Sequence, residues 1–206
     1  MRASRKIFFS WLPLAVAVTG LAMLVQLTVQ QNYRQLLNDP QIQMAEDLAN
    51  EMNSLPSGSL AAIEDRVSAH PVNIANDLAP WSGIYALDGE GGVGTMATAA
   101  ILNGGPAMPP AGVFDINAWK GPIVDHHLIS NPNENRVTWQ PQADVREAIV
   151  IVPFQTPSGI KGFAVAGRNM REVEDREGAL GTIVLLAWIC IMGATLVAKA
   201  LAYYLA

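Results

Sequence analysis

The sequence predicts an α+β fold in which two transmembrane helices bracket one domain, a long helix packed on a five-stranded antiparallel sheet. Three observations lead to this fold class. Two uncharged apolar runs lie near the ends of the chain, Ile7–Val29 and Ala179–Ala198. Helical periodicity follows the first run. Five strand-like stretches, separated by turns rich in Gly, Pro and Asp, precede the second run.

Each apolar run is long enough to cross a bilayer. A helix rises about 1.5 Å per residue, so either run covers the roughly 30 Å hydrocarbon core. We place the transmembrane helices at residues 7–29 and 179–201. A cleaved signal peptide is the alternative for the first run, but its apolar part is typically about 7–15 residues long and ends at a small-x-small site. The first run is longer and no such site lies near its end, so we expect it to be retained.

Positive charges predict the orientation. Four basic residues flank the two runs: Arg2, Arg5, Lys6 and Lys199. Basic residues close to a membrane helix stay on the cytoplasmic side. Residues 1–6 and 202–206 are therefore expected inside the cell, and residues 30–178 are expected to form the extracytoplasmic domain. The lipid bilayer of the cytoplasmic membrane is the first expected partner.

The expected outer domain is strongly acidic. With the four flanking basic residues set aside, nine of the 13 Lys and Arg residues remain against all 18 Asp and Glu residues, a net charge near −9. This charge argues against nucleic acid as a partner and against docking onto anionic lipid. The single cysteine, Cys190, lies in the second run. The domain therefore has no disulfide and must fold on its hydrophobic core.

Helices are expected in the first part of the domain. The first transmembrane helix continues past the membrane and is predicted to be interrupted at residues 38–40, because Pro40 suits the first turn of a new helix capped by Asp39. Apolar residues then recur every three to four positions, which predicts an amphipathic helix. These residues are Ile42, Ala45, Leu48, Met52 and Leu55. A short second helix follows, with Leu60, Ile63 and Val67 turned inward.

Strands are expected in the rest of the domain. Residues 81–99 predict a hairpin whose turn lies at 88–92. Residues 101–125 are rich in Gly and Pro and predict a loop with little regular structure. The last three predicted strands are separated by short polar turns and should form a meander. They are Arg136–Gln140, Val145–Phe154 and Gly159–Asn169, and a charged helix runs from there into the second span.

This order of elements resembles the single Cache domain, the PAS-like extracytoplasmic sensor module of bacterial two-span membrane receptors. Three segments carry the likeness: GIYALDGEGGVGTMATA as the first hairpin, TWQP with REAIVIVPF as central strands, and GFAVAGRNMREVE as the last strand turning into a helix. The likeness covers roughly Gln31–Glu177 and rests on element order. It implies a bacterial cytoplasmic (inner) membrane and a small ligand, such as a carboxylate or an amino acid, bound over the sheet.

The resemblance also sets an expectation about output. Receptors of this kind normally continue from the second span into a kinase, cyclase or chemotaxis module. Residues 202–206 provide no such module. We therefore expect any signal to pass through a membrane-protein partner or a homodimer.

Few residues suggest catalysis. Adjacent residues on an extended chain point to opposite sides, so Asp125, His126 and His127 are a weak metal set. No G-x-S-x-G motif occurs, and neither Lys120 nor Lys161 has a serine at a telling distance. The sequence predicts a protein that is not an enzyme and needs no metal or cofactor.

A tentative ligand site can be assembled from aromatic and basic residues of the predicted strands. These residues are Trp81, Tyr85, Trp139, Arg146 and Arg168. A guanidinium group can hold a carboxylate through two hydrogen bonds, and indole rings can enclose the rest of a small ligand. The alternative is that the aromatics fill the core and the arginines pair with Glu147, Glu172 or Glu174.

Two functions therefore stay open. The first is a sensor-like domain that binds a small molecule or an envelope protein and acts through a membrane partner. The second is a non-enzymatic accessory or scaffold subunit of an envelope complex. An enclosed pocket containing Trp139 and Arg146 would favour the sensor, and a filled core would favour the scaffold. A membrane-tethered hydrolase is the third alternative, without a nucleophile–base pair to support it.

Overall fold

The computed structural model of the chain describes residues 2–56, 58–88, 92–114 and 135–205. Two compact units are present. One consists of Met1–Gln35 with Val173–Ala206, and the other is Leu36–Glu172. We describe each unit by itself.

Two long helices begin and end the described chain. They are α1 (Arg2–Asn53) and α3 (Arg171–Leu205). The segments Arg5–Asn32 and Arg171–Leu205 are long and apolar enough to cross a membrane. The prediction of two long apolar terminal helices is therefore confirmed.

The predicted interruption of the first helix is wrong. Helix α1 continues through residues 38–40 without a break. A proline inside a helix removes one backbone hydrogen bond and crowds the carbonyl group four residues earlier, at a cost of about 3 kcal/mol, which packing must offset. The residues beyond Pro40 pack firmly on the sheet, with Ala45, Leu48 and Met52 almost completely buried. This packing holds the helix on the far side of the proline.

In the unit that contains both apolar segments, two reciprocal hydrogen bonds join α1 and α3. Trp11 Nε1 donates to Thr195 Oγ1 at 2.9 Å. In the opposite sense, Trp188 Nε1 of α3 donates to Thr19 Oγ1 of α1 at 3.0 Å. Each helix thus supplies one indole donor and one hydroxyl acceptor. Two such bonds in opposite senses favour one register of the two helices.

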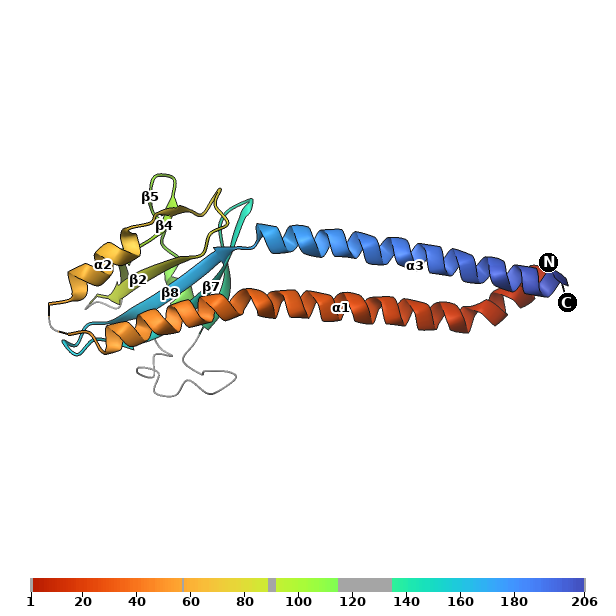
Figure 1. Cartoon of the computed structure of the whole chain (residues 1–206), viewed down its shortest axis with the longest axis horizontal. Helices are drawn as coiled ribbons and strands as arrows, with labels where there is room; N and C mark the ends of the chain where they lie inside the picture. The colour runs from red at the N-terminus through yellow and green to blue at the C-terminus, as the bar shows by residue number, and fades with distance from the viewer. Residues whose placement is uncertain (1, 57, 89–91, 115–134, 206) are drawn as a thin grey trace. The chain divides into compact units, whose positions relative to one another are not determined.

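The second unit contains a five-stranded sheet in the order β3-β2-β8-β7-β6, and every neighbouring pair is antiparallel. Figure 1 shows β2, β8 and β7 side by side. The strands are β2 (Trp81–Leu87), β3 (Val93–Thr98), β6 (Asn135–Gln142), β7 (Val145–Gln155) and β8 (Lys161–Asn169). The predicted antiparallel sheet is confirmed.

A smaller sheet, which the sequence did not predict, lies in the same unit. It has the order β1-β4-β5 and uses Val72–Asn73, Ala100–Leu102 and Gly105–Pro106. A short 3₁₀ turn, η1 (Ala111–Val113), follows. The predicted irregular stretch 101–125 thus contains regular structure as far as residue 114, and its remainder lies outside the described residues.

Hydrophobic residues cover both faces of the large sheet. On one face, α1 and the short helix α2 (Leu60–Ser68) pack against residues such as Ile84 and Val150. The other face is aromatic and is packed with residues of the small sheet. Successive residues of a strand point to opposite faces, so Ile149 lies on the aromatic face next to Val150 on the helical face. We call these surfaces the helical face and the aromatic face.

Candidate functional site

Three residues of the predicted ligand site meet on the aromatic face. Trp81, Tyr85 and Trp139 are all buried in one hydrophobic cluster. The rings of Trp81 and Trp139 meet edge-on with centroids 6.4 Å apart. The Tyr85 ring lies 5.4 Å from that of Phe114. These contacts are those of a packed core.

The Tyr85 hydroxyl group makes hydrogen bonds inside this core. It donates to the Ala107 carbonyl oxygen at 3.0 Å and lies 3.3 Å from Thr98 Oγ1. Burial raises the pKa of Tyr85 to about 12, against a smaller opposite effect of the Thr98 hydrogen bond. The hydroxyl therefore stays neutral and ties the large sheet to the chain that follows β5.

The two arginines of the predicted site lie on the other side of the sheet. Trp139 is the ladder partner of Glu147, so both point to the aromatic face and the exposed Arg146 points away from it. Arg168 is paired with Ala148 on the helical side and binds Glu172 through Nη2 at 2.9 Å. The structure thus assembles the three aromatics but does not bring the arginines to them.

Glu147 is the polar centre of the aromatic face. Its side chain is completely buried. Trp81 Nε1 donates to Glu147 Oε2 at 2.9 Å. The other oxygen, Oε1, has no hydrogen-bond partner among the residues that the structure describes. A buried carboxyl group with one unpaired oxygen is costly when charged, which makes this residue the first candidate for a function.

The buried position changes the acidity of this carboxyl group. Desolvation raises the pKa of Glu147 from 4.5 to about 7. The hydrogen bond from Trp81 and the neighbouring Asn169 amide favour the charged form, but their effect is smaller than that of burial. Glu147 can therefore gain and lose a proton close to neutral pH.

Asn169 connects Glu147 to the start of α3. The two residues are ladder partners between β7 and β8. Asn169 Nδ2 donates to the Ile74 carbonyl oxygen at 3.0 Å, and its Oδ1 accepts from Arg171 N at 2.8 Å. Met170 lies between Asn169 and Arg171 in the chain, and its backbone N donates to the Arg146 carbonyl oxygen at 2.8 Å. We call Asn169, Met170 and Arg171 the exit junction.

A glycine makes room for the Trp81 indole. Gly167 is the ladder partner of Trp81. A Cβ atom at Gly167 would lie only 2.5 Å from Trp81 Cε2 and Cζ2. The indole therefore lies directly against the β8 backbone, in the position from which it reaches Glu147.

The alternation of residues along β7 is a signal in the sequence that could have identified Glu147. In VREAIVIV, the residues at 145, 147, 149 and 151 share one face of the strand. Three of them are apolar, so Glu147 stands in a buried register. The sequence-based prediction considered Glu147 only as a partner for an arginine. Arg168 binds Glu172 instead, which was another of the expected pairings.

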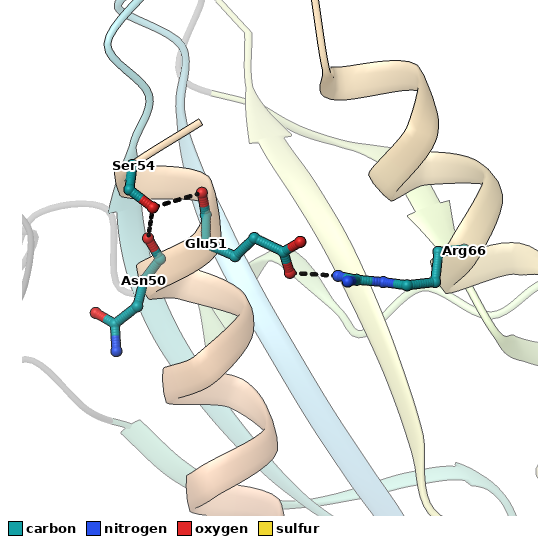
Figure 2. Close-up of polar contacts among 4 residues, drawn as sticks. All are labelled: Asn50, Glu51, Ser54 and Arg66. Atoms are coloured by element: carbon teal, nitrogen blue, oxygen red, sulfur yellow. Dashed lines mark hydrogen bonds and ion pairs between the residues drawn. The ribbon is translucent and has the colours of Figure 1, made fainter. Parts of the chain in front are cut away.

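The helical face carries an open groove of about 440 Å³ between α1, α2 and the start of β2. Figure 2 shows two of its lining residues, Glu51 of α1 and Arg66 of α2, pointing toward one another, and they form an ion pair. Both side chains remain partly exposed. The groove is lined by Met44, Asp47, Leu48, Glu51, Arg66, Val67, His70, Pro80, Trp81, Ser82 and Ala99. Charged and apolar side chains thus both line this groove.

Within the described ranges, no group of three or more His, Cys, Asp or Glu side chains is placed to hold a metal ion. The weak candidate metal ligands named above lie outside these ranges, as does Lys120. These ligands are Asp125, His126 and His127. The chemistry that the described residues offer is proton uptake at Glu147 and polar binding in the groove. Comparisons with protein-family models, curated proteins and solved structures find no match for this chain.

Proposed function

We propose that this chain is a membrane-anchored, extracytoplasmic sensor-like protein of the bacterial cytoplasmic membrane. Its domain responds to a small molecule or an envelope protein and biases a membrane partner, or a second copy, without an enzymatic step. The Cache-like relationship belongs to this proposal. It is supported by the long first helix, the five antiparallel strands and the last strand leading into a helix.

The observation that carries the proposal is the exit junction. Strand β8 lies in the middle of the sheet and ends at Asn169, and α3 begins at Arg171. One residue separates them, and that residue is held by a backbone hydrogen bond to β7. A change in the centre of the sheet therefore has a short covalent path to an apolar helix long enough to cross a membrane.

The reciprocal Trp–Thr hydrogen bonds support a shared movement of the two apolar segments. They favour a fixed register between Trp11 and Thr195 and between Trp188 and Thr19. In this proposal a signal moves the pair together relative to a partner, rather than sliding α3 along α1. The orientation with both termini inside, set by the basic flanks, is also part of the proposal.

The groove on the helical face is the proposed ligand site. It replaces the aromatic face, whose residues pack against one another. One wall is formed by Asp47 and Glu51, and the opposite wall carries Arg66 and His70. A dipolar ligand such as an amino acid would replace the Glu51–Arg66 ion pair with contacts from its own ammonium and carboxylate groups.

A specific observation favours a second function, the accessory or scaffold subunit. Trp139 lies in a filled core and Arg146 points to the other face, so these two do not line a common pocket. In that case the domain binds a protein and no small molecule. The groove would then be part of a docking surface.

Thermal unfolding of the full chain in lipid nanodiscs against a panel of small metabolites tests the proposal. A ligand at 100 times its dissociation constant should stabilise the fold by about 2.7 kcal/mol. We expect stabilisation by at least one small dipolar molecule, and we expect Arg66→Ala to abolish it. Arg146→Ala, a change at an exposed residue of β7 that does not line the groove, is the control that should leave it intact.

The outcome separates the two candidates. A panel without any stabilising compound, together with a protein that co-purifies with the full chain, would support the scaffold. Stabilisation that is lost in Arg146→Ala and kept in Arg66→Ala would place the ligand outside the groove.

A further inference from the structure

We infer that Glu147 is a proton-binding site whose occupancy controls how firmly the exit junction is held. This inference deepens the proposed function, on which it rests, by naming the proton as an input to the domain. Three features support it: a completely buried carboxyl group, an oxygen without a partner among the described residues, and a direct ladder contact with the residue that holds the start of α3.

The surroundings of Glu147 are nearly all uncharged. It meets Trp81 from β2, Trp139 from β6 and Asn169 from β8. Among the described residues, the segment 73–75 that Asn169 contacts also binds two charged side chains: Arg171 Nη2 donates to the Ala75 carbonyl oxygen, and Asp77 Oδ2 accepts from Asn73 N. Both are engaged with backbone groups, and burial dominates the raised pKa of Glu147.

The two protonation states make different demands on Asn169. The neutral acid accepts the hydrogen bond from Trp81 and carries one O–H donor of its own, so it attracts acceptors rather than further donors. A carboxylate in the same position attracts a further donor to Oε1, since a buried charge without hydrogen bonds is costly. The donor directly across the ladder is the Asn169 amide. Drawing this amide toward Oε1 weakens its bonds to the Ile74 carbonyl oxygen and to Arg171 N.

The direction of the pH effect follows from the raised pKa. The folded chain holds the Glu147 proton up to about pH 7, whereas the ordinary value for a glutamate is 4.5. Between these values the folded state binds more protons than the unfolded state, so the free energy of unfolding falls as pH rises. Below pH 4.5 the contribution is complete, and above about pH 7 it is lost. We therefore expect the hydrogen bonds of the exit junction to be strongest at acidic pH and to weaken as the pH rises through about 7.

Amide hydrogen exchange of the full chain in nanodiscs tests this switch. Exchange of residues 170–172 is measured from about pH 5 to about pH 8.5 and corrected for the intrinsic pH dependence. We expect protection in the wild type to fall by on the order of tenfold across a midpoint near pH 7. Glu147→Gln keeps the shape and cannot titrate, so its protection should stay at the acid level throughout. Asp65→Asn, an exposed carboxyl change on α2, should behave like the wild type.

The opposite outcomes overturn the inference. The inference is wrong if the exchange protection of residues 170–172 in the wild type does not change near neutral pH. It is also wrong if Glu147→Gln shows the same change in protection as the wild type. If Glu147→Gln does not fold, the wild-type midpoint decides: a value near 7 supports the switch and a value near 4.5 rejects it. The proposed function fails separately, in the metabolite panel, which is run at a single pH.

Discussion

Replacing Trp81 with phenylalanine should destabilise the domain by about 2 kcal/mol at pH 5 and by about 4 kcal/mol at pH 8. At both pH values the change removes part of a completely buried ring. At pH 8 it also removes the hydrogen bond that Trp81 Nε1 donates to a charged carboxylate, which is stronger than a bond to a neutral acid. Denaturant unfolding of the full chain at the two pH values gives both numbers.

Loss of the Trp81 hydrogen bond also shifts the titration of Glu147. The bond favours the charged form of the carboxyl group, so its removal raises the folded-state pKa above about 7. The range in which stability falls with pH then extends to higher pH. Trp139→Phe is the matched control, because Trp139 touches the Trp81 ring edge-on and its loss should cost a similar amount at both pH values. If Trp81→Phe lowers the free energy of unfolding equally at pH 5 and pH 8, the Trp81 indole does not bind a charged Glu147 at pH 8, and the prediction is wrong.

Gly167→Ala should destabilise the domain by about 2–3 kcal/mol. The new methyl group would lie 2.5 Å from two carbon atoms of the Trp81 indole. An indole is rigid and this one is completely buried, so it must move as a whole. Its movement takes Nε1 away from Glu147, adding a lost hydrogen bond to the steric cost. Unfolding measurements of the full chain provide the test.

A second glycine in the same sheet is the control for this change. A Cβ atom at Gly94 of β3 would meet nothing within 4 Å. Gly94→Ala should therefore change the free energy of unfolding by less than about 1 kcal/mol, with stabilisation as the expected direction. Equal effects at Gly94 and Gly167 would mean that the Trp81 contact does not limit residue 167.

Much of the fold could be predicted from the sequence because its periodicities are strong. The buried residues Ala45, Leu48 and Met52 follow helical spacing, and the last three strands are separated by turns with Pro, Asp and Gly. The helix break predicted at Pro40 was wrong, since local chemistry favours a helix start there while the packing of the following turns keeps one helix. The small sheet could not be predicted because strands of two or three residues leave no periodic signal.

The candidate site was less accessible from the sequence. Residue types suggested Arg146 as a ligand residue, but the strand register turns it away from the aromatics and turns Glu147 toward them. A shift by one residue exchanges the two faces of a strand, so the choice depends on the register of pairing. The groove joins residues from two helices and a strand that are far apart in sequence, and it required the tertiary structure.

The most direct test of the central claim is a titration of the Glu147 carboxyl carbon by ¹³C NMR in the full chain, assigned by its absence in Glu147→Gln. We predict that the Glu147 carboxyl resonance titrates with a midpoint near pH 7. A Glu147 midpoint close to the ordinary value of 4.5 would mean that the carboxyl group is solvated, and the proton-controlled exit junction would be wrong.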